Sequence, residues 1–177
     1  LGIPYISPYN VHSILNPILV MCMGLGYYFN MYKGMPLVRE GGVIIMTHPT
    51  QPDFHPVHHP SYIDFFEQVL ADTTDPKVMS EKWEKQYAED EWYKHLYRTT
   101  YAYHGVHPFY MWYWGSHALQ HCSRIIIVGG DPKTVRRLGF VPASTMDDAL
   151  EIASDVVGRA PTITHLHAPP LMVADVS

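Results

Sequence analysis

Short apolar runs bounded by glycine and proline divide the chain into candidate strands. Residues 18–24 (ILVMCMG), 41–49 (GGVIIMTHP) and 124–130 (RIIIVGG) are continuous apolar runs, typical of strands buried on both faces. Periodicity alone leaves a helix open for the first of these runs. The extended segment 140–144 (FVPAS) and the run 162–168 (TITHLHA) add two more candidates. We therefore predict a sheet of four to five strands.

Helical segments alternate with these strands in the last third of the chain. Residues 131–139 begin with an Asp-Pro pair and end at a glycine, as short helices commonly do. Residues 145–158 begin with Thr145 as the helix cap and end at Gly158. Strands that alternate with helices predict an α/β fold with a mostly parallel sheet covered by helices.

The middle of the chain predicts helices rather than strands. Residues 61–72 predict one helix, and residues 75–98, whose charges alternate in sign, predict a solvated helical hairpin. An aromatic-rich helix is expected over about residues 108–122. We interpret residues 49–103 as a helical insertion within a single α/β domain that spans the whole chain.

Composition narrows the classes of function. The chain has 177 residues, of which 47% are apolar and only 16% charged, against roughly 25% charged in an average soluble domain. Its net charge of −5 and the lack of a basic cluster argue against nucleic acid as a partner. The longest apolar run, residues 17–29, is shorter than the roughly 20 residues of a membrane span. Cys22 and Cys122 are expected to be buried, reduced thiols, which favours a cytoplasmic location.

Four histidines lie in the proline-rich stretch HPTQPDFHPVHHP, residues 48–60: His48, His55, His58 and His59. Neutral imidazoles close together in sequence suit a metal or proton-transfer site, but the spacing matches no known metal motif. His55, His58 and His59 are therefore only weak metal candidates. We favour a rigid loop after a strand end, where ligands of parallel α/β sheets bind. Such a loop could face a neighbouring domain or a substrate.

A second histidine pair, His104 and His107, precedes the aromatic-rich helix. A helix N-terminus favours anions, so a substrate carboxylate would suit this position. Local capping of the helix is the alternative. His117 and His121 share one face of the same helix but lack the glutamate of a zinc-protease motif, so we interpret them as residues at the edge of the core.

The last third also resembles a known family, the C-terminal domain of the nickel-pincer-dependent lactate racemases. That family shows the pattern P-x-x-V-R-x-L-G-F-x-P-A followed by an amphipathic helix containing Ala-Leu. The matching residues here are Pro132, Val135, Arg136, Leu138, Gly139, Phe140, Pro142, Ala143, Ala149 and Leu150. Weaker matches are Asn30 and Tyr32 before the strand at residues 41–45, and His107 before Pro108. The likeness covers residues 18–48 and 104–171, and the middle, residues 49–103, diverges.

The resemblance implies the C-terminal part of a longer, two-domain racemase or epimerase of small 2-hydroxy acids. The nickel pincer cofactor and the catalytic histidines would lie on a racemase-like N-terminal domain, with no cofactor bound by this domain alone. Here Asn30, Tyr32, Lys33, His48 and His107 would face the substrate. The family pattern has a second lysine where Pro36 stands, which puts lactate itself in doubt as the substrate.

A function of another class remains open. The chain could be a non-catalytic binding or assembly module that presents a face rich in histidine and aromatic residues to a protein partner. A homo-oligomer is one such assembly. The sequence that precedes Leu1 in the complete reading frame would discriminate between the two functions.

Overall fold

The computed structural model of the protein describes residues 15–29 and 35–166. Over these residues the sheet has three parallel strands in the order β1-β2-β3, which are β1 (Val43–Thr47), β2 (Arg124–Val128) and β3 (Val141–Ala143). Ile126 in the central strand pairs with Ile45 on one side and Val141 on the other. The predicted mixed α/β fold with a parallel sheet is confirmed, but the described residues form fewer strands than the four to five expected.

The apolar run at residues 18–24 is a helix, so its prediction as a strand was wrong. It forms α1 (Pro17–Met21) and continues as the π-helical segment η2 (Cys22–Tyr28). The Asn16 side chain accepts hydrogen bonds from the backbone N–H groups of Ile18 and Leu19, and a proline occupies the first turn. All residues of α1 are buried, and a helix buried all round shows no polar face in the sequence.

The run at residues 162–168 is also not a strand where the structure describes it. Residues 161–166 have no regular secondary structure, and residues 162–165 are exposed. The preceding helix ends at Gly158, which has a φ of 80°. Strand propensity reflects packing on a half-buried surface, and this exposed segment makes no such packing.

The middle of the chain is helical, as predicted. Its helical elements are α2 (Pro60–Asp64), η3 (Phe65–Val69), α3 (Leu70–Asp72), α4 (Pro76–Met79), η4 (Ser80–Glu84), α5 (Lys85–Glu89) and α6 (Glu91–Thr99). Asp75 caps α4 as expected, and Asp90 caps α6 and divides the hairpin. One continuous hydrophobic core joins these helices to α1, to α7 (His107–His121) and to the sheet.

The remaining helices confirm the predicted caps. α8 (Pro132–Arg137) begins after Asp131, whose carboxylate accepts a hydrogen bond from the Thr134 N–H. α9 (Met146–Val157) begins with a reciprocal capping box between Thr145 and Asp148. Both cysteines are buried and unbridged, as expected.

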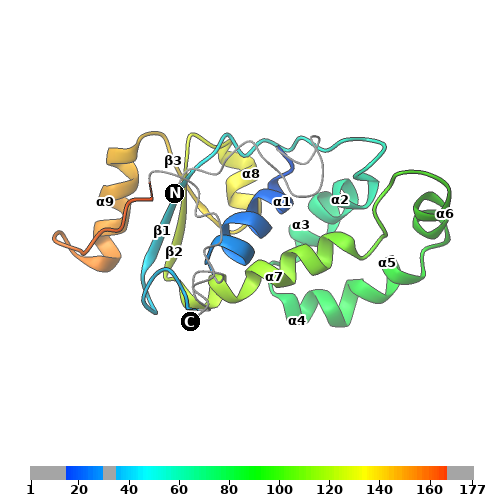
Figure 1. Ribbon diagram of the computed structural model, residues 1–177, viewed down its shortest axis with the longest axis horizontal. Helices are drawn as coiled ribbons and strands as arrows, with labels where there is room; N and C mark the ends of the chain where they lie inside the picture. The colour runs from blue at the N-terminus through cyan, green and yellow to red at the C-terminus, as the bar shows by residue number, and fades with distance from the viewer. Residues whose placement is uncertain (1–14, 30–34, 167–177) are drawn as a thin grey trace, which may run out of the picture.

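The sheet lies between two unequal helical layers. Among the described helices, α9 is the one that covers one face, while α1, α7 and α8 lie on the other side, and α2 to α6 extend away from the sheet (Figure 1). Alternate strand residues separate the layers: Ile126 packs against Ala149 and Ala153 of α9, whereas Ile125 and Ile127 join the larger core. The larger core, which includes α1, α7 and α8, thus packs against only one face of the sheet.

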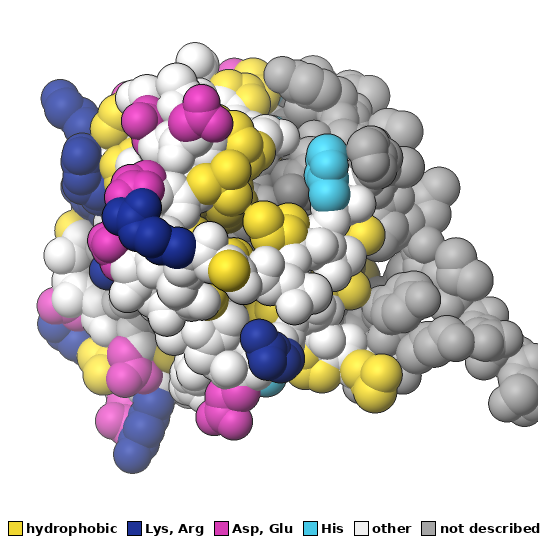
Figure 2. Space-filling model, turned by 90° about the vertical axis from the view of Figure 1, so that its left-hand side faces the viewer, with side chains coloured by type: hydrophobic (Ala, Val, Ile, Leu, Met, Phe, Trp, Pro, Cys, Tyr) yellow, Lys and Arg dark blue, Asp and Glu magenta, His cyan; other side chains and the backbone are white. Residues whose placement is uncertain are grey.

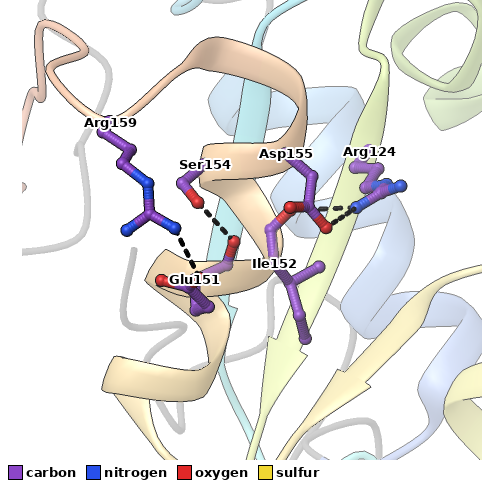
Figure 3. A network of polar contacts seen from close by, with 6 residues as sticks. All are labelled: Arg124, Glu151, Ile152, Ser154, Asp155 and Arg159. Carbon is purple, nitrogen blue, oxygen red and sulfur yellow. Dashed lines mark hydrogen bonds and ion pairs between the residues drawn. The ribbon is translucent and has the colours of Figure 1, made fainter.

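Polar contacts with β2 also hold the C-terminal half of α9. The Arg124 guanidinium, at the amino end of β2, donates a hydrogen bond of 2.9 Å to the Ile152 carbonyl and lies 3.8 Å from Asp155 Oδ2 (Figure 3). Figure 2 shows the outer surface on the side of the molecule where α9 lies, and there hydrophobic side chains lie among charged ones. Exposed apolar side chains of α9 and the segment after it are Met146, Leu150, Val156 and Ile163.

Candidate functional site

The carboxyl end of β1 forms a tight, buried corner. His48 directly follows the strand, and its backbone N–H continues the ladder by donating to the Val128 carbonyl at 3.3 Å. Its ring nitrogen Nδ1 accepts a hydrogen bond of 2.9 Å from the Thr50 N–H, and the Thr50 hydroxyl lies 3.2 Å from both Nδ1 and the His48 carbonyl oxygen. His48 and Thr50 are both buried. We call this pair the strand-end corner.

The strand-end corner lies against the turn between β2 and α8. The Asp131 N–H donates to the Pro49 carbonyl at 2.9 Å, and Gly129 N–H donates to Ala143 at the end of β3. A Cβ on Gly130 would lie 2.7 Å from Val135 Cγ2 and 2.8 Å from Ile127 Cγ2, so these side chains favour glycine in the turn, which also lies close to Thr50. The carboxyl ends of all three strands therefore meet beside His48, where parallel α/β sheets bind their ligands.

A second group of aromatic and polar residues surrounds the start of α2. We call it the histidine–tyrosine cluster; its members are Asn16, His55, His58, His59, Tyr62, Tyr103 and His107. His59 Nδ1 lies 3.3 Å from the His55 N–H and 3.4 Å from the Asn16 amide. His55 Nδ1 in turn accepts from the His58 N–H at 3.2 Å. Both His55 and His59 thus accept hydrogen bonds from the backbone of the loop through Nδ1.

Stacked rings connect this loop to the start of α7. Tyr103 lies nearly parallel to both His59 and His107, with ring centroids 5.5 and 4.4 Å away. The Tyr62 hydroxyl lies 2.5 Å from His107 Nδ1 and is placed to donate a hydrogen bond to it. Burial, with a smaller contribution from His104, lowers the pKa of His107 to about 4. His107 is therefore a neutral acceptor near pH 7.

The predicted site residues fall into separate groups. His48 lies in the strand-end corner, whereas His107 lies in the histidine–tyrosine cluster as the first residue of α7. Asn30, Tyr32 and Lys33 lie outside the described residues. His117 and His121, interpreted as core-edge residues, both pack against Phe29.

The weak metal candidates do not form a metal site in the described parts of the chain. No group of three histidine, cysteine, aspartate or glutamate side chains there is arranged to hold a metal ion. The Nδ1 atoms of His55 and His59 face backbone N–H groups, so their lone pairs are already engaged.

Sequence reasoning did not single out Thr50, Tyr62 or Tyr103. The sequence points to Thr50 only through its position two residues after His48, the histidine that follows a predicted strand. Tyr62 and His107 are 45 residues apart, and no local pattern reports a contact over that separation. Tertiary packing alone brings them together.

A groove lies apart from these two groups, on the outer side of α7. It has a volume of about 530 Å³ and is lined by Gly26, Tyr110, Tyr113, Trp114 and His117. A side chain on Gly26 would collide with the Trp114 indole, so the glycine allows the close approach of that ring to η2. Tyr110 and Trp114 are exposed.

Neither membrane-spanning helices nor similarity to known proteins indicates what these residues do. Among residues 15–29 and 35–166, no helix is both long enough and apolar enough to cross a membrane. The chain matches no protein-family model, no curated protein and no solved structure.

Proposed function

We propose that this chain is the C-terminal capping domain of a cytoplasmic, lactate racemase-like 2-hydroxy-acid racemase or epimerase. The observation that carries the proposal is the strand-end corner, which places His48 at the carboxyl edge of a parallel sheet. Ligands of such sheets bind at this edge. The resemblance supplies the substrate class, a small 2-hydroxy acid.

The segment with the strongest resemblance supports the same proposal. It forms the consecutive elements β2, α8, β3 and α9, with parallel strands joined through helices. Its Gly139, at a φ of 79°, ends α8 in a conformation that glycine adopts readily. This unit holds the β2–α8 turn against the strand-end corner.

The nickel pincer cofactor would lie on the racemase-like N-terminal domain that the resemblance implies. The described residues of this chain offer no ligand set for nickel. The contribution of this chain would be to bind and orient the substrate. Lys33, by resemblance, would supply a cation for the substrate carboxylate.

The test begins with the complete reading frame that contains this chain. We expect it to encode a racemase-like N-terminal domain, and we expect the purified complete protein to interconvert the enantiomers of a short 2-hydroxy acid. Chiral chromatography of a panel of such acids measures this. The 177-residue chain alone should give no turnover. A reading frame without that domain, or turnover by the chain alone, would contradict the proposal.

A second candidate function is assembly with a protein partner or another copy of the chain. The groove on α7 favours it, because Tyr110 and Trp114 expose large aromatic side chains there. Aromatic residues are enriched at protein interfaces.

If assembly is the function, Trp114→Ala should weaken self-association at least about tenfold, because buried tryptophans are common interface hot spots. Sedimentation velocity over a range of concentrations measures this. Trp92→Ala, at an exposed tryptophan on α6, is the matched control. A wild-type chain that stays monomeric at every concentration would rule out the homo-oligomer.

A further inference from the structure

The groove on the outer side of α7 is walled by aromatic side chains at helical spacing. Tyr113 and Trp114 follow Tyr110 by three and four residues on α7, so the three side chains lie on the same side of the helix. The Tyr110 and Tyr113 rings meet edge to face, with centroids 6.2 Å apart. Tyr110 is 52% exposed and Trp114 is 47% exposed, so both can contact a molecule in the groove.

Contacts with other elements hold these rings in place before anything binds. Because Gly26 has no side chain, the Trp114 indole approaches η2 closely and also contacts Tyr27, with ring centroids 5.7 Å apart. The Tyr113 hydroxyl donates a hydrogen bond of 2.8 Å to Glu84 Oε2 in η4. A site that is already formed loses little side-chain entropy on binding, which favours affinity for a small ligand.

The electrostatics of the groove favour a cation. None of the described residues that line it is lysine or arginine, and the histidine among them, His117, has a pKa lowered by partial burial and by His121. The Glu84 carboxylate beside Tyr113 forms no ion pair with any residue in 15–29 or 35–166. Aromatic faces also carry negative partial charge. A positive ligand is therefore attracted both by the rings and by Glu84.

An alkylated ammonium ion suits these walls better than a metal ion or a primary amine does. The parts of the chain that the structure describes hold no group of three side chains suited to a metal ion. A primary ammonium has three N–H donors, which a groove lined mainly by aromatic carbon would leave short of acceptors. A quaternary ammonium has no N–H group and carries its charge on methyl groups, which pack directly on aromatic faces.

We propose that this groove binds a small quaternary ammonium compound, with the methyl groups of the ligand against Tyr110, Tyr113 and Trp114. The Glu84 carboxylate stabilises the positive charge of the ligand. The volume of the groove, about 530 Å³, falls within the range of roughly 300–1,000 Å³ that is typical of small-molecule sites. The site is separate from the strand-end corner, and it does not rest on the proposed racemase function.

Choline is the probe, and 3,3-dimethylbutan-1-ol, which has the same shape but a carbon in place of the charged nitrogen, is its neutral control. The indole N–H signals of the ¹⁵N-labelled chain report binding, and the Trp114→Phe spectrum assigns the signal of Trp114. Choline chloride should shift this signal to saturation at roughly millimolar concentration and bind at least about tenfold more tightly than the neutral alcohol. The signal of Trp92, on α6, should stay in place, and sodium chloride at matched concentrations should not reproduce the shift. Equal affinity for choline and the alcohol, or no saturable shift, would overturn the proposal.

Two pairs of substitutions test the groups that hold the ligand. Tyr110→Leu removes an exposed ring and should weaken choline binding at least about threefold, whereas Tyr110→Phe keeps the ring and should bind within about twofold of the wild type. Glu84→Gln keeps an acceptor for the Tyr113 hydroxyl but removes the charge, so binding at low ionic strength should weaken about twofold. Glu89→Gln, at an exposed carboxylate of α5, should bind as the wild type does. Unchanged affinity in Tyr110→Leu would overturn the role of the rings, and unchanged affinity in Glu84→Gln would overturn that of the carboxylate.

Other occupants of the groove give different results in the same titration. If a second copy of the chain fills the groove, the Trp114 signal should shift with protein concentration, and choline should leave it unchanged. If the natural ligand is a modified protein, a peptide that carries trimethyllysine should bind at least about tenfold more tightly than choline. Either result would overturn the proposal, and neither depends on whether the complete protein racemises a 2-hydroxy acid.

Discussion

Replacing Phe65 with alanine is expected to lower the free energy of unfolding by about 3–5 kcal/mol. Phe65 has no exposed surface, and its ring meets Phe109 of α7 edge to face, with ring centroids 4.8 Å apart. Truncation removes buried apolar surface and leaves a cavity between η3 and α7 that the surrounding helices can fill only in part. Urea denaturation followed by tryptophan fluorescence measures the change.

The same experiment tests whether the middle helices belong to the main core. Phe65 lies in a hydrophobic cluster that also contains Ile18 of α1 and Ile125 of β2. We therefore expect the whole described fold to unfold in one transition, with coincident fluorescence and circular-dichroism curves. Ile63→Ala is the matched control: Ile63 precedes Phe65 by two residues but is exposed, so less than about 1 kcal/mol should be lost. A separate early transition of the middle helices would contradict this expectation.

Elements with local start and stop signals were predictable from the sequence. Asp131 before Pro132 and Thr145 before α9 cap their helices where the pattern placed them. These signals work because a cap is a contact between neighbours in sequence, so its geometry is encoded within a few residues. The ends of α8 and α9 at Gly139 and Gly158 follow the same logic.

The two wrong strand predictions share a physical cause. Residues 18–24 are apolar on every side because their helix is enclosed by α7 and the middle helices, so the period of 3.6 is hidden. Residues 162–166 have strand-like composition but form no strand, and most of them are exposed. In both cases the outcome depends on tertiary neighbours, which no local pattern contains.

The candidate site was predictable in part. The position of His48 after a strand and of His107 at a helix start followed from local signals. The partners of these histidines did not, because Tyr62 reaches His107 only through the packing of α2 on α7. The φ of 40° at Thr50, which lies beside Gly130 of the β2–α8 turn, likewise has no local signal in the sequence.

Acidification from about pH 6.5 to about pH 4 is expected to remove up to about 3 kcal/mol of stability through His107 alone. Burial lowers the pKa of His107 from 6.5 in the ordinary state to about 4 in the fold. Between these values the unfolded chain binds a proton that the folded chain does not, so the free energy of unfolding falls as the pH falls. The contribution of neutral His107 to the free energy of unfolding is fully present above pH 6.5 and is lost as the pH approaches 4.

His107→Asn isolates this effect, because asparagine keeps an acceptor for the Tyr62 hydroxyl near the Nδ1 position but does not titrate. The variant should be less stable than the wild type at pH 7, since it fills less of the space beside Tyr103. Its stability should then fall by about 2–3 kcal/mol less than that of the wild type on acidification. His95→Asn, at an exposed histidine of α6, should follow the wild-type curve. Urea denaturation at several pH values measures all three proteins, and parallel curves for the wild type and His107→Asn would show that His107 already titrates normally in the fold. Such a result would require the ring to be solvated, and burial beneath Tyr103 could then no longer be the cause of its neutrality.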